Sequence, residues 1–481
     1  MKHTVLTFCL FAILLTFSSQ TFAVDFMVNL TTDEHDASTL DNVCDTDLAT
    51  LGEQCTLRAA VEQANALVTD DLVTFNKLPA NSMIILTTAN NGEIPIENNG
   101  GLTISGFGAN LLTIDGGAGT NRIFYSNGAN LLISGLTLTG GNGTGTTVNG
   151  AGGAIFANDG TLTLDRVHIT GNSAVERGGG VYFAGHGTFS ITNSTLSNNN
   201  AFTGGGFEIE GYLLTVVNST ISGNMARNGG GGGFFTNNAY ATLRNVTITN
   251  NTARTGGGIF QYDGRMYIGN SILAGNTATN IGREFDFNRS IFSNGFNLIG
   301  DSEGDSTNTG GIISYRSTDI LDTNPMLCPL AYNGSSIPTH ALLPGSPVID
   351  KGYFFDSTTD QRGLPRPVDL ASYPNATGGD GADIGAYELQ TAPTAASISV
   401  SGRVITAQGR GINQVRVTIT EASGEIRTAY SNPLGYYRFS DVPAGATYVV
   451  SVSHKRYQFN QSTQVLSVFE ETNGINFVAD N

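Results

Sequence analysis

Short runs of alternating apolar and polar residues recur along the middle of the chain, and each unit closes on an asparagine. The asparagines recur at intervals of 27, 25, 27 and 25 residues, at Asn172, Asn199, Asn224, Asn251 and Asn276. An alanine follows two residues after each, and a glycine run then leads into a column of apolar residues, formed by Ile155, Val181, Phe207, Phe234 and Ile259. A repeat of this length with fixed columns is typical of a solenoid, in which each unit stacks on the one before it.

Each repeat holds three short alternating runs, separated by the glycine, asparagine, serine and threonine residues that favour turns. The pattern predicts an all-β fold, a right-handed parallel β-helix of the pectate-lyase kind with three strands per coil. A β-propeller would need repeats of about 40 residues, and leucine-rich repeats would show a leucine consensus. We expect residues 101–300 to form about eight coils, with the asparagines stacked as a ladder at the strand spacing of about 4.8 Å.

The ends of such a cylinder expose sheet edges and must be covered. Residues 55–67 carry apolar side chains at helical spacing, so we expect one amphipathic helix that caps the N-terminal end. Cys44 precedes this helix and Cys55 lies at its start. No nearby histidine or further cysteine completes a metal site, so we expect a structural disulfide between the two cysteines. Cys328 lies in an apolar segment and is expected to be buried.

Residues 1–23 have the pattern of a signal peptide: a weakly basic start, an apolar stretch and small residues before Val24. We therefore expect an exported protein, secreted or associated with the cell surface. No other apolar run is long enough to cross a membrane, so membrane insertion is not expected. The 40 acidic residues outnumber 23 basic ones, and this net charge of -17 argues against nucleic acid as a partner.

Two sets of motifs resemble domains of exported bacterial β-helix proteins. The segment from Cys55 to Ala60 resembles the Cys-Ser-Leu-Arg-Glu-Ala motif of the CSLREA family, and departs from it at Thr56 and Ala59. Four ordered motifs are similar to the choice-of-anchor Q domain: 297–300, 339–350, 360–363 and 383–388. These resemblances imply a surface location rather than a chemical activity. They divide the chain into a cap region at 24–100, repeats at 101–300 and a C-terminal part of the β-helix at 301–390.

The tail changes character after a linker at residues 391–396. Residues 397–481 lack the glycine runs and resemble the carboxypeptidase regulatory-like domain, a small transthyretin-like β-sandwich. The resemblance implies an accessory domain without a peptidase site. Within the aromatic strand at 436–439, we expect Tyr437 and Phe439 to lie in the core of the sandwich.

Right-handed β-helices host pectate and alginate lyases and polygalacturonases, but a fold does not confer an activity. Pectate lyases need an Arg or Lys base beside clustered carboxylates, and no lysine occurs between Lys77 and Lys351. The Gly-His-Gly at His186 matches a polygalacturonase motif without its aspartates. We therefore expect a noncatalytic, adhesin-like or matrix-associated protein that binds an extracellular glycan or protein. The alternative is a polysaccharide lyase or glycoside hydrolase acting on an acidic polysaccharide, which three or more carboxylates with an Arg or His in one cleft would favour.

Glu208 and Glu210 lie two residues apart on one expected strand, so both side chains should point outward. Adjacent coils would add further charged residues to this face: Arg227, Arg254, Asp263 and Arg265. The simpler interpretation is a solvated strand face, and the functional one is a saccharide or Ca²⁺ site.

A second candidate for Ca²⁺ is the alternating set Asp301, Glu303 and Asp305, although the glycine and distal glutamate of an EF-hand are missing. No other cofactor is expected. Three glycosylation acceptor sequences fall in one repeat column, which a turn requirement explains better: Asn193, Asn218 and Asn245.

Overall fold

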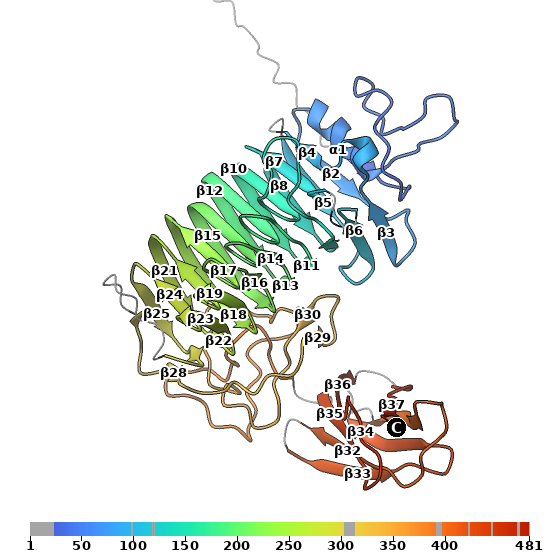
Figure 1. Ribbon diagram of the computed structural model, residues 1–481, viewed down its shortest axis with the longest axis vertical. Coiled ribbons are helices and arrows are strands. Elements are labelled where there is room, and N and C mark those ends of the chain that lie inside the picture. Colours follow the sequence, from blue (N-terminus) through green and yellow to red (C-terminus); the bar gives the residue numbers. More distant parts are fainter. Residues whose placement is uncertain are drawn as a thin grey trace, which may run out of the picture.

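The computed structural model describes residues 24–97, 100–117, 119, 121–302, 313–390, 397–421, 424–443, 446–468 and 472–480. The expected signal peptide at 1–23 and the linker at 391–396 lie outside these ranges. The described chain is all-β apart from the helix α1 (Leu57–Ala66) and the 3₁₀ turn η1 (Thr88–Asn90). It forms an elongated parallel β-helix and a β-sandwich, as the repeats and the tail predict (Figure 1).

Parallel strands of successive coils line up into three faces. Face 1 contains β4 (Ile94–Ile96), β7 (Phe124–Asn127), β10 (Ile155–Asp165), β12 (Val181–Thr192), β15 (Phe207–Ser222), β17 (Phe234–Asn237), β20 (Ile259–Gln261) and β24 (Phe285–Phe287). Face 2 contains β1 (Asp25–Met27), β2 (Asp71–Thr74), β5 (Gly101–Ser105), β8 (Asn130–Ser134), the later parts of β10, β12 and β15, then β18 (Ala239–Thr249), β21 (Gly264–Gly269), β25 (Ile291–Gly295) and β27 (Ile313–Ser314).

Face 3 completes the triangular coil. It contains β3 (Ser82–Ile85), β6 (Leu112–Asp115), β9 (Thr137–Thr139), β11 (His168–Thr170), β13 (Thr195–Ser197), the ends of β15 and β18, then β22 (Ile272–Ala274), β26 (Leu298–Ile299) and β28 (Ile320–Leu321). A small fourth sheet follows face 3 along the chain and contains β14 (Asn200–Ala201), β16 (Met225–Ala226), β19 (Thr252–Thr255) and β23 (Thr277–Ile281). The coils begin before residue 101, because β2, β3 and β4 of the expected cap region pair with β5, β6 and β7.

The expected apolar columns fill the interior of the coils. Every member of the column that begins at Ile155 and ends at Ile259 is fully buried. Within this column Phe207 and Phe234 stack with their ring centroids 4.6 Å apart. The glycines before the column are required by the close approach of the coils, since a Cβ on Gly205 would lie 2.4 Å from the carbonyl oxygen of Gly232.

The asparagine column forms the expected ladder along the turn after face 3. Each side-chain amide donates to the side-chain oxygen of the next asparagine over 2.9–3.0 Å. That oxygen also accepts the backbone N–H of the preceding asparagine. The ladder starts where Gly141 N–H donates to Asn172 and ends where Asn276 donates to the buried carboxylate of Glu284 at 2.6 Å. The ladder therefore pairs polar groups of the turn that the strands leave without partners.

A second asparagine ladder lies at the turn between faces 2 and 3. Its members all have positive φ angles, which asparagine tolerates well: Asn193, Asn218, Asn245 and Asn270. Asn245 donates to Asn218 at 3.1 Å, and Asn270 donates to Asn245 at 2.9 Å. Asn218 and Asn245 are buried, so the backbone requirement of this turn, rather than glycosylation, accounts for the repeated acceptor sequence.

After β28 the chain leaves the coils and folds back along face 3. This returning segment, residues 322–390, includes the short antiparallel pair β29 (Ala331–Tyr332) and β30 (Pro338–Thr339). Polar groups of face 3 bond to it: Thr220 donates to Gln361 at 2.6 Å, and Thr247 accepts the backbone N–H of Ala386 at 3.0 Å. Of the described part of the region 301–390, which the sequence predicts as part of the β-helix, only β27 and β28 add strands to the coils, and the returning segment packs against face 3.

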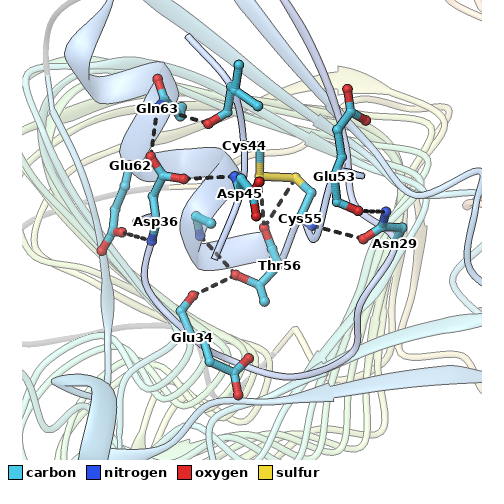
Figure 2. The surroundings of a disulfide bond; sticks show 12 residues. Asn29, Glu34, Asp36, Cys44, Asp45, Glu53, Cys55, Thr56, Glu62 and Gln63 are labelled. Carbon is cyan, nitrogen blue, oxygen red and sulfur yellow. Dashed lines mark hydrogen bonds between the residues drawn. A yellow bond between two sulfur atoms is a disulfide. The ribbon is translucent and has the colours of Figure 1, made fainter. Parts of the chain in front are cut away.

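The helix α1 covers the N-terminal end of the coils, as expected (Figure 1). The hydroxyl of Thr56 caps it by accepting the N–H of Ala59 at 3.0 Å. The expected disulfide joins Cys44 to Cys55 and ties the preceding loop to the helix start (Figure 2). Arg58 points inward from the helix, is 1% exposed and pairs with Asp33 at 2.9 Å. The cap is thus fixed both covalently and by a buried ion pair.

The tail is a sandwich of two sheets. One sheet contains β31 (Ser397–Thr406), β34 (Tyr436–Pro443) and β37 (Phe477–Ala479), and the other contains β32 (Arg416–Glu421), β33 (Ile426–Tyr430), β35 (Ala446–Ser453) and β36 (Thr463–Val468). Tyr437 and Phe439 are buried in its core, as expected from the alternation, and Tyr436 between the turn and this pair is exposed.

Replacing Asn224 with leucine tests the ladder. The change removes the side-chain bonds to the carbonyl of Leu196 and to the backbone N–H of Asn199, and each buried group left unpaired costs about 1–3 kcal/mol. We expect the free energy of unfolding, measured by urea titration, to fall by about 3 kcal/mol. The control Asn228→Leu lies in an exposed bend and should change it by less than about 0.5 kcal/mol. Equal effects of the two changes would contradict the role of the ladder.

Replacing Cys55 with serine tests the disulfide. The unfolded chain regains the freedom of the loop closed across 11 positions, so the free energy of unfolding should fall by about 2–4 kcal/mol. The measurement is urea titration without reductant. Peptide mass spectra of the wild-type protein that find both thiols free would refute the pairing.

Candidate functional site

An outward-facing column runs along face 1 and carries mostly aromatic side chains. The strand register places seven residues of successive coils in line: Tyr125, Phe156, Tyr182, Glu208, Phe235, Phe260 and Asp286. Phe156 stacks on Tyr182 with ring centroids 5.2 Å apart, and Phe235 stacks on Phe260 at 5.0 Å. Glu208 stands between these two stacks and interrupts the column.

A hollow of about 520 Å³ opens beside this interruption. We call it the face 1 hollow, and it is lined by Val175, Glu176, Arg177, Phe202, Thr203, Glu208, Glu210 and Phe235. Glu208 and Glu210 come from β15, and Phe235 comes from β17. The other lining residues, including Glu176, come from the segments that lead into β12 and β15. The hollow therefore combines three carboxylates, one guanidinium and two phenyl rings.

Arg177 organises the polar side of the hollow. Its Nη1 lies 2.7 Å from Glu210 Oε1 and donates to the hydroxyl of Tyr182 at 3.1 Å. The Tyr182 hydroxyl in turn donates to Glu210 Oε2 at 2.8 Å. Burial and the neighbouring Glu210 raise the pKa of Tyr182, so this hydroxyl keeps its proton and remains a donor. Both oxygens of Glu210 are thereby held in position.

Glu208 is covered rather than solvated. Its side chain is 3% exposed, the hydroxyl of Thr203 donates to its Oε2 at 2.5 Å, and Arg177 Nε lies 3.9 Å from its Oε1. Burial raises the pKa of Glu208 to about 7, and Glu210 adds to the rise, although Thr203 and Arg177 oppose it. The interpretation of this strand face as solvated is therefore wrong for Glu208, because side chains from adjacent turns close over it.

Other residues that the sequence suggested for this face do not line the hollow. Arg227 lies beside it, where it bonds the side chain of Asn200 and the carbonyls of Ala174 and Val175, and Asp263 pairs with Arg289 at 2.9 Å. His186 is exposed at an irregularity between faces 1 and 2 and does not line the hollow. The Gly-His-Gly motif thus takes no part in the site.

The second Ca²⁺ candidate is described only in part. Asp301 pairs with Arg283 at 2.9 Å, and Glu303 and Asp305 lie outside the described residues. Within the described ranges, no group of three or more His, Cys, Asp or Glu side chains is arranged to hold a metal ion. Calcium at residues 301–305 therefore stays a prediction.

A larger hollow of about 610 Å³ lies where the returning segment meets the coils. Its wall includes His340 and Cys328, and both are buried. The ring of His340 bonds the Cys328 carbonyl at 2.6 Å and the Ser222 hydroxyl at 2.8 Å, so both ring nitrogens are engaged. Burial raises the pKa of the Cys328 thiol to about 12, which removes its nucleophilic form at neutral pH. We therefore take the face 1 hollow as the better candidate site.

Sequence reasoning found the two glutamates of the hollow but missed their partners. Tyr182 precedes Glu208 by 26 residues and Phe235 follows it by 27, so the repeat interval alone could have identified both. Arg177 and Thr203 occupy the same position of successive repeats, 26 residues apart, but the residue type at this position changes from coil to coil, so the sequence does not mark them as part of the site.

Comparison with known families supports one part of the chain. The model of the carboxypeptidase regulatory-like domain matches residues 399–479, which are the sandwich and none of the β-helix. A comparison with curated proteins finds no match. Among the helices of the described residues, none is long and apolar enough to cross a membrane.

The raised pKa of Glu208 predicts a pH dependence of stability. A carboxyl whose pKa is higher in the folded chain stabilises the fold below its unfolded pKa, and this contribution is lost as the pH rises through the folded value. For Glu208 the window extends from about pH 4.5 to about pH 7. Glu208→Gln does not titrate, so its free energy of unfolding should rise relative to the wild type across this window.

Urea titrations at both ends of the window measure the difference. Glu53→Gln, an exposed carboxylate of the cap, serves as the control and should follow the wild-type profile. A Glu208→Gln profile parallel to that of the wild type would contradict the assignment.

Proposed function

We propose that this chain is an exported, noncatalytic glycan-binding protein of the cell surface or extracellular matrix, and that the face 1 hollow binds its sugar. The observation that carries the proposal is the pairing of phenyl rings with fixed hydrogen-bonding groups in one hollow. Phe202 is exposed and Phe235 is half-buried beside the engaged Glu210 and Arg177. A pyranose ring offers apolar C–H faces that stack on the phenyl rings and hydroxyls that bond to the polar groups of Glu210 and Arg177.

Charge narrows the class of sugar. Three carboxylates line the hollow against one guanidinium, and Arg177 is already paired with Glu210. A uronate or sulfated sugar would meet net negative charge and no unengaged cation in this lining. We therefore infer a neutral or amino-substituted glycan, in place of the acidic polysaccharide that the fold alone suggests.

The engaged state of the two glutamates favours binding over catalysis. A general acid must reach the leaving oxygen, but Glu208 is buried under Thr203 and Arg177. Glu210 has both oxygens committed to Tyr182 and Arg177. Glu208 is therefore covered, and Glu210 is held as a fixed acceptor, so neither carboxyl is placed to transfer a proton in this arrangement.

Glycoside hydrolysis is the second candidate, because one observation favours it. The hollow holds three carboxylates with an arginine, and the pKa of Glu208 is raised to about 7, as a general acid requires. Catalysis would need Arg177 and Thr203 to move aside when substrate binds. An uncovered Glu208 in a sugar complex would support this alternative.

Export and surface association rest on separate support. The Cys44–Cys55 disulfide fits an oxidising compartment, and the apolar pattern of residues 1–23 fits a signal peptide. The C-terminal sandwich offers a second, independent β surface for attachment. The CSLREA and choice-of-anchor Q resemblances agree with this location.

A glycan array followed by calorimetry tests the proposal. We expect neutral or amino glycans to bind and uronates to fail. Phe235→Ala and Glu210→Gln should each weaken binding by about tenfold, or ~1.4 kcal/mol. Tyr262→Ala removes an exposed aromatic side chain outside the hollow and is the matched control. Reducing-sugar assays on the same glycans, and 235 nm lyase assays on uronates, should show no turnover, and turnover abolished by Glu208→Gln would establish the hydrolase instead.

A further inference from the structure

The N-terminal cap contains a buried amide surrounded by oxygen atoms. Gln63 of α1 is 0% exposed, and its side chain points from the helix into the loop before the disulfide (Figure 2). Four oxygens lie around its Nε2: Asp36 Oδ2 at 2.6 Å, Ser38 O at 2.6 Å, Val43 O at 3.1 Å and Asp41 Oδ1 at 3.2 Å. Two of these belong to carboxylates and two to backbone carbonyls.

An amide group cannot satisfy this arrangement. A glutamine NH₂ has two protons for the four acceptors, whereas the Oε1 of Gln63 is buried without a hydrogen-bond partner. The oxygen and nitrogen of an amide exchange places by a half-turn of the terminal torsion, and their assignment rests on the surrounding bonds. With the amide turned, Oε1 takes the place of Nε2 and faces the four surrounding oxygens, and a cation held among these five oxygens would relieve their repulsion.

We propose that Asp36, Asp41, Gln63 and the carbonyls of Ser38 and Val43 hold a calcium ion in the cap. Carboxylate, amide and backbone carbonyl oxygens are the ligands Ca²⁺ takes, six to eight at a time, and water completes the shell. The ligands come from an irregular loop, which suits the flexible coordination of Ca²⁺ better than the strict octahedron of Mg²⁺. With only two carboxylates, the site differs in composition from a cluster of acidic side chains.

The electrostatics of the loop agree with a bound cation. Asp36 and Asp41 both approach the same Nε2 of Gln63, and Glu62 accepts the backbone N–H of Asp36 at 2.9 Å. The nearby His35 lies 2.5 Å from Glu62 and so is already paired. A divalent ion would offset the repulsion between these neighbouring carboxylates.

Calcium would hold a loop that carries exposed apolar side chains. The segment between Asp36 and Cys55 exposes four of them: Leu40, Val43, Leu48 and Leu51. The disulfide ties this segment at Cys44, and the ion would tie the part before it to α1 through Gln63. Removing calcium should therefore loosen residues 36–43 while the coils stay folded.

The test uses the full-length, disulfide-intact protein after EDTA treatment and dialysis. We expect calorimetry to show one Ca²⁺ site, Mg²⁺ to bind far more weakly, and Ca²⁺ to raise the melting temperature of the wild type. Asp36→Asn and Asp41→Asn should each weaken Ca²⁺ binding by about tenfold. The control Glu53→Gln changes an exposed carboxylate of the same loop that pairs with Lys77, and should bind Ca²⁺ like the wild type.

Gln63→Glu gives opposite results for a calcium site and for a loop in which Nε2 of Gln63 donates to the four oxygens without an ion. In a calcium site it adds a charged ligand, so Ca²⁺ affinity and the melting shift should both increase. If Nε2 instead donates to the four oxygens without an ion, the new carboxylate is repelled and the melting temperature falls with or without Ca²⁺. That result would overturn the proposal, and so would a wild-type melting temperature that does not change when Ca²⁺ is added.

Discussion

The β-helix depends on one constraint: each coil must lie one strand spacing from the next and in register, so that the backbone groups of a whole turn find partners. Strands meet this requirement on the three faces, but the turns need side chains to do so. The asparagine ladder does this after face 3, because one amide can serve its own coil and both neighbours, as that of Asn251 does. The glycines before the apolar column follow from the same spacing, since the backbones approach too closely there for a Cβ.

The three faces meet solvent differently, and this difference decides where a site can form. Face 3 is covered by the returning segment, whose buried pairs Asp360–Arg362 and Arg366–Glu388 hold it together. Face 1 keeps an outward column of stacked aromatic rings, and Glu208 is the point where the stacking stops. The candidate site therefore lies where the regular pattern of the repeat is broken, which is where functional residues are expected.

Periodic and local features could be predicted from the sequence, and contacts between distant segments could not. The ladder, the inward column and the helix after Cys55 each leave a signal at fixed spacing. The cover over Glu208 leaves none, because it depends on how Arg177 and Thr203 of neighbouring turns are placed. The returning segment pairs residues 141 positions apart, as in Thr220 and Gln361, without any repeat to mark the partner. The crowded amide of Gln63 likewise emerges only when the loop folds onto α1.

The two asparagine ladders have opposite polarity. In the ladder from Asn172 to Asn276 each amide donates to the asparagine of the next coil, whereas in the one from Asn193 to Asn270 each amide donates to the asparagine of the preceding coil. Aligned amide dipoles add along a row, as they do in an α-helix, so each ladder has a positive and a negative end. The positive end of the first row meets the carboxylate of Glu284, and its negative end accepts a backbone N–H. The two rows lie at opposite ends of face 3 and run in opposite directions, so their axial dipoles oppose each other, and the cylinder can lengthen by whole coils without the two rows adding to one dipole.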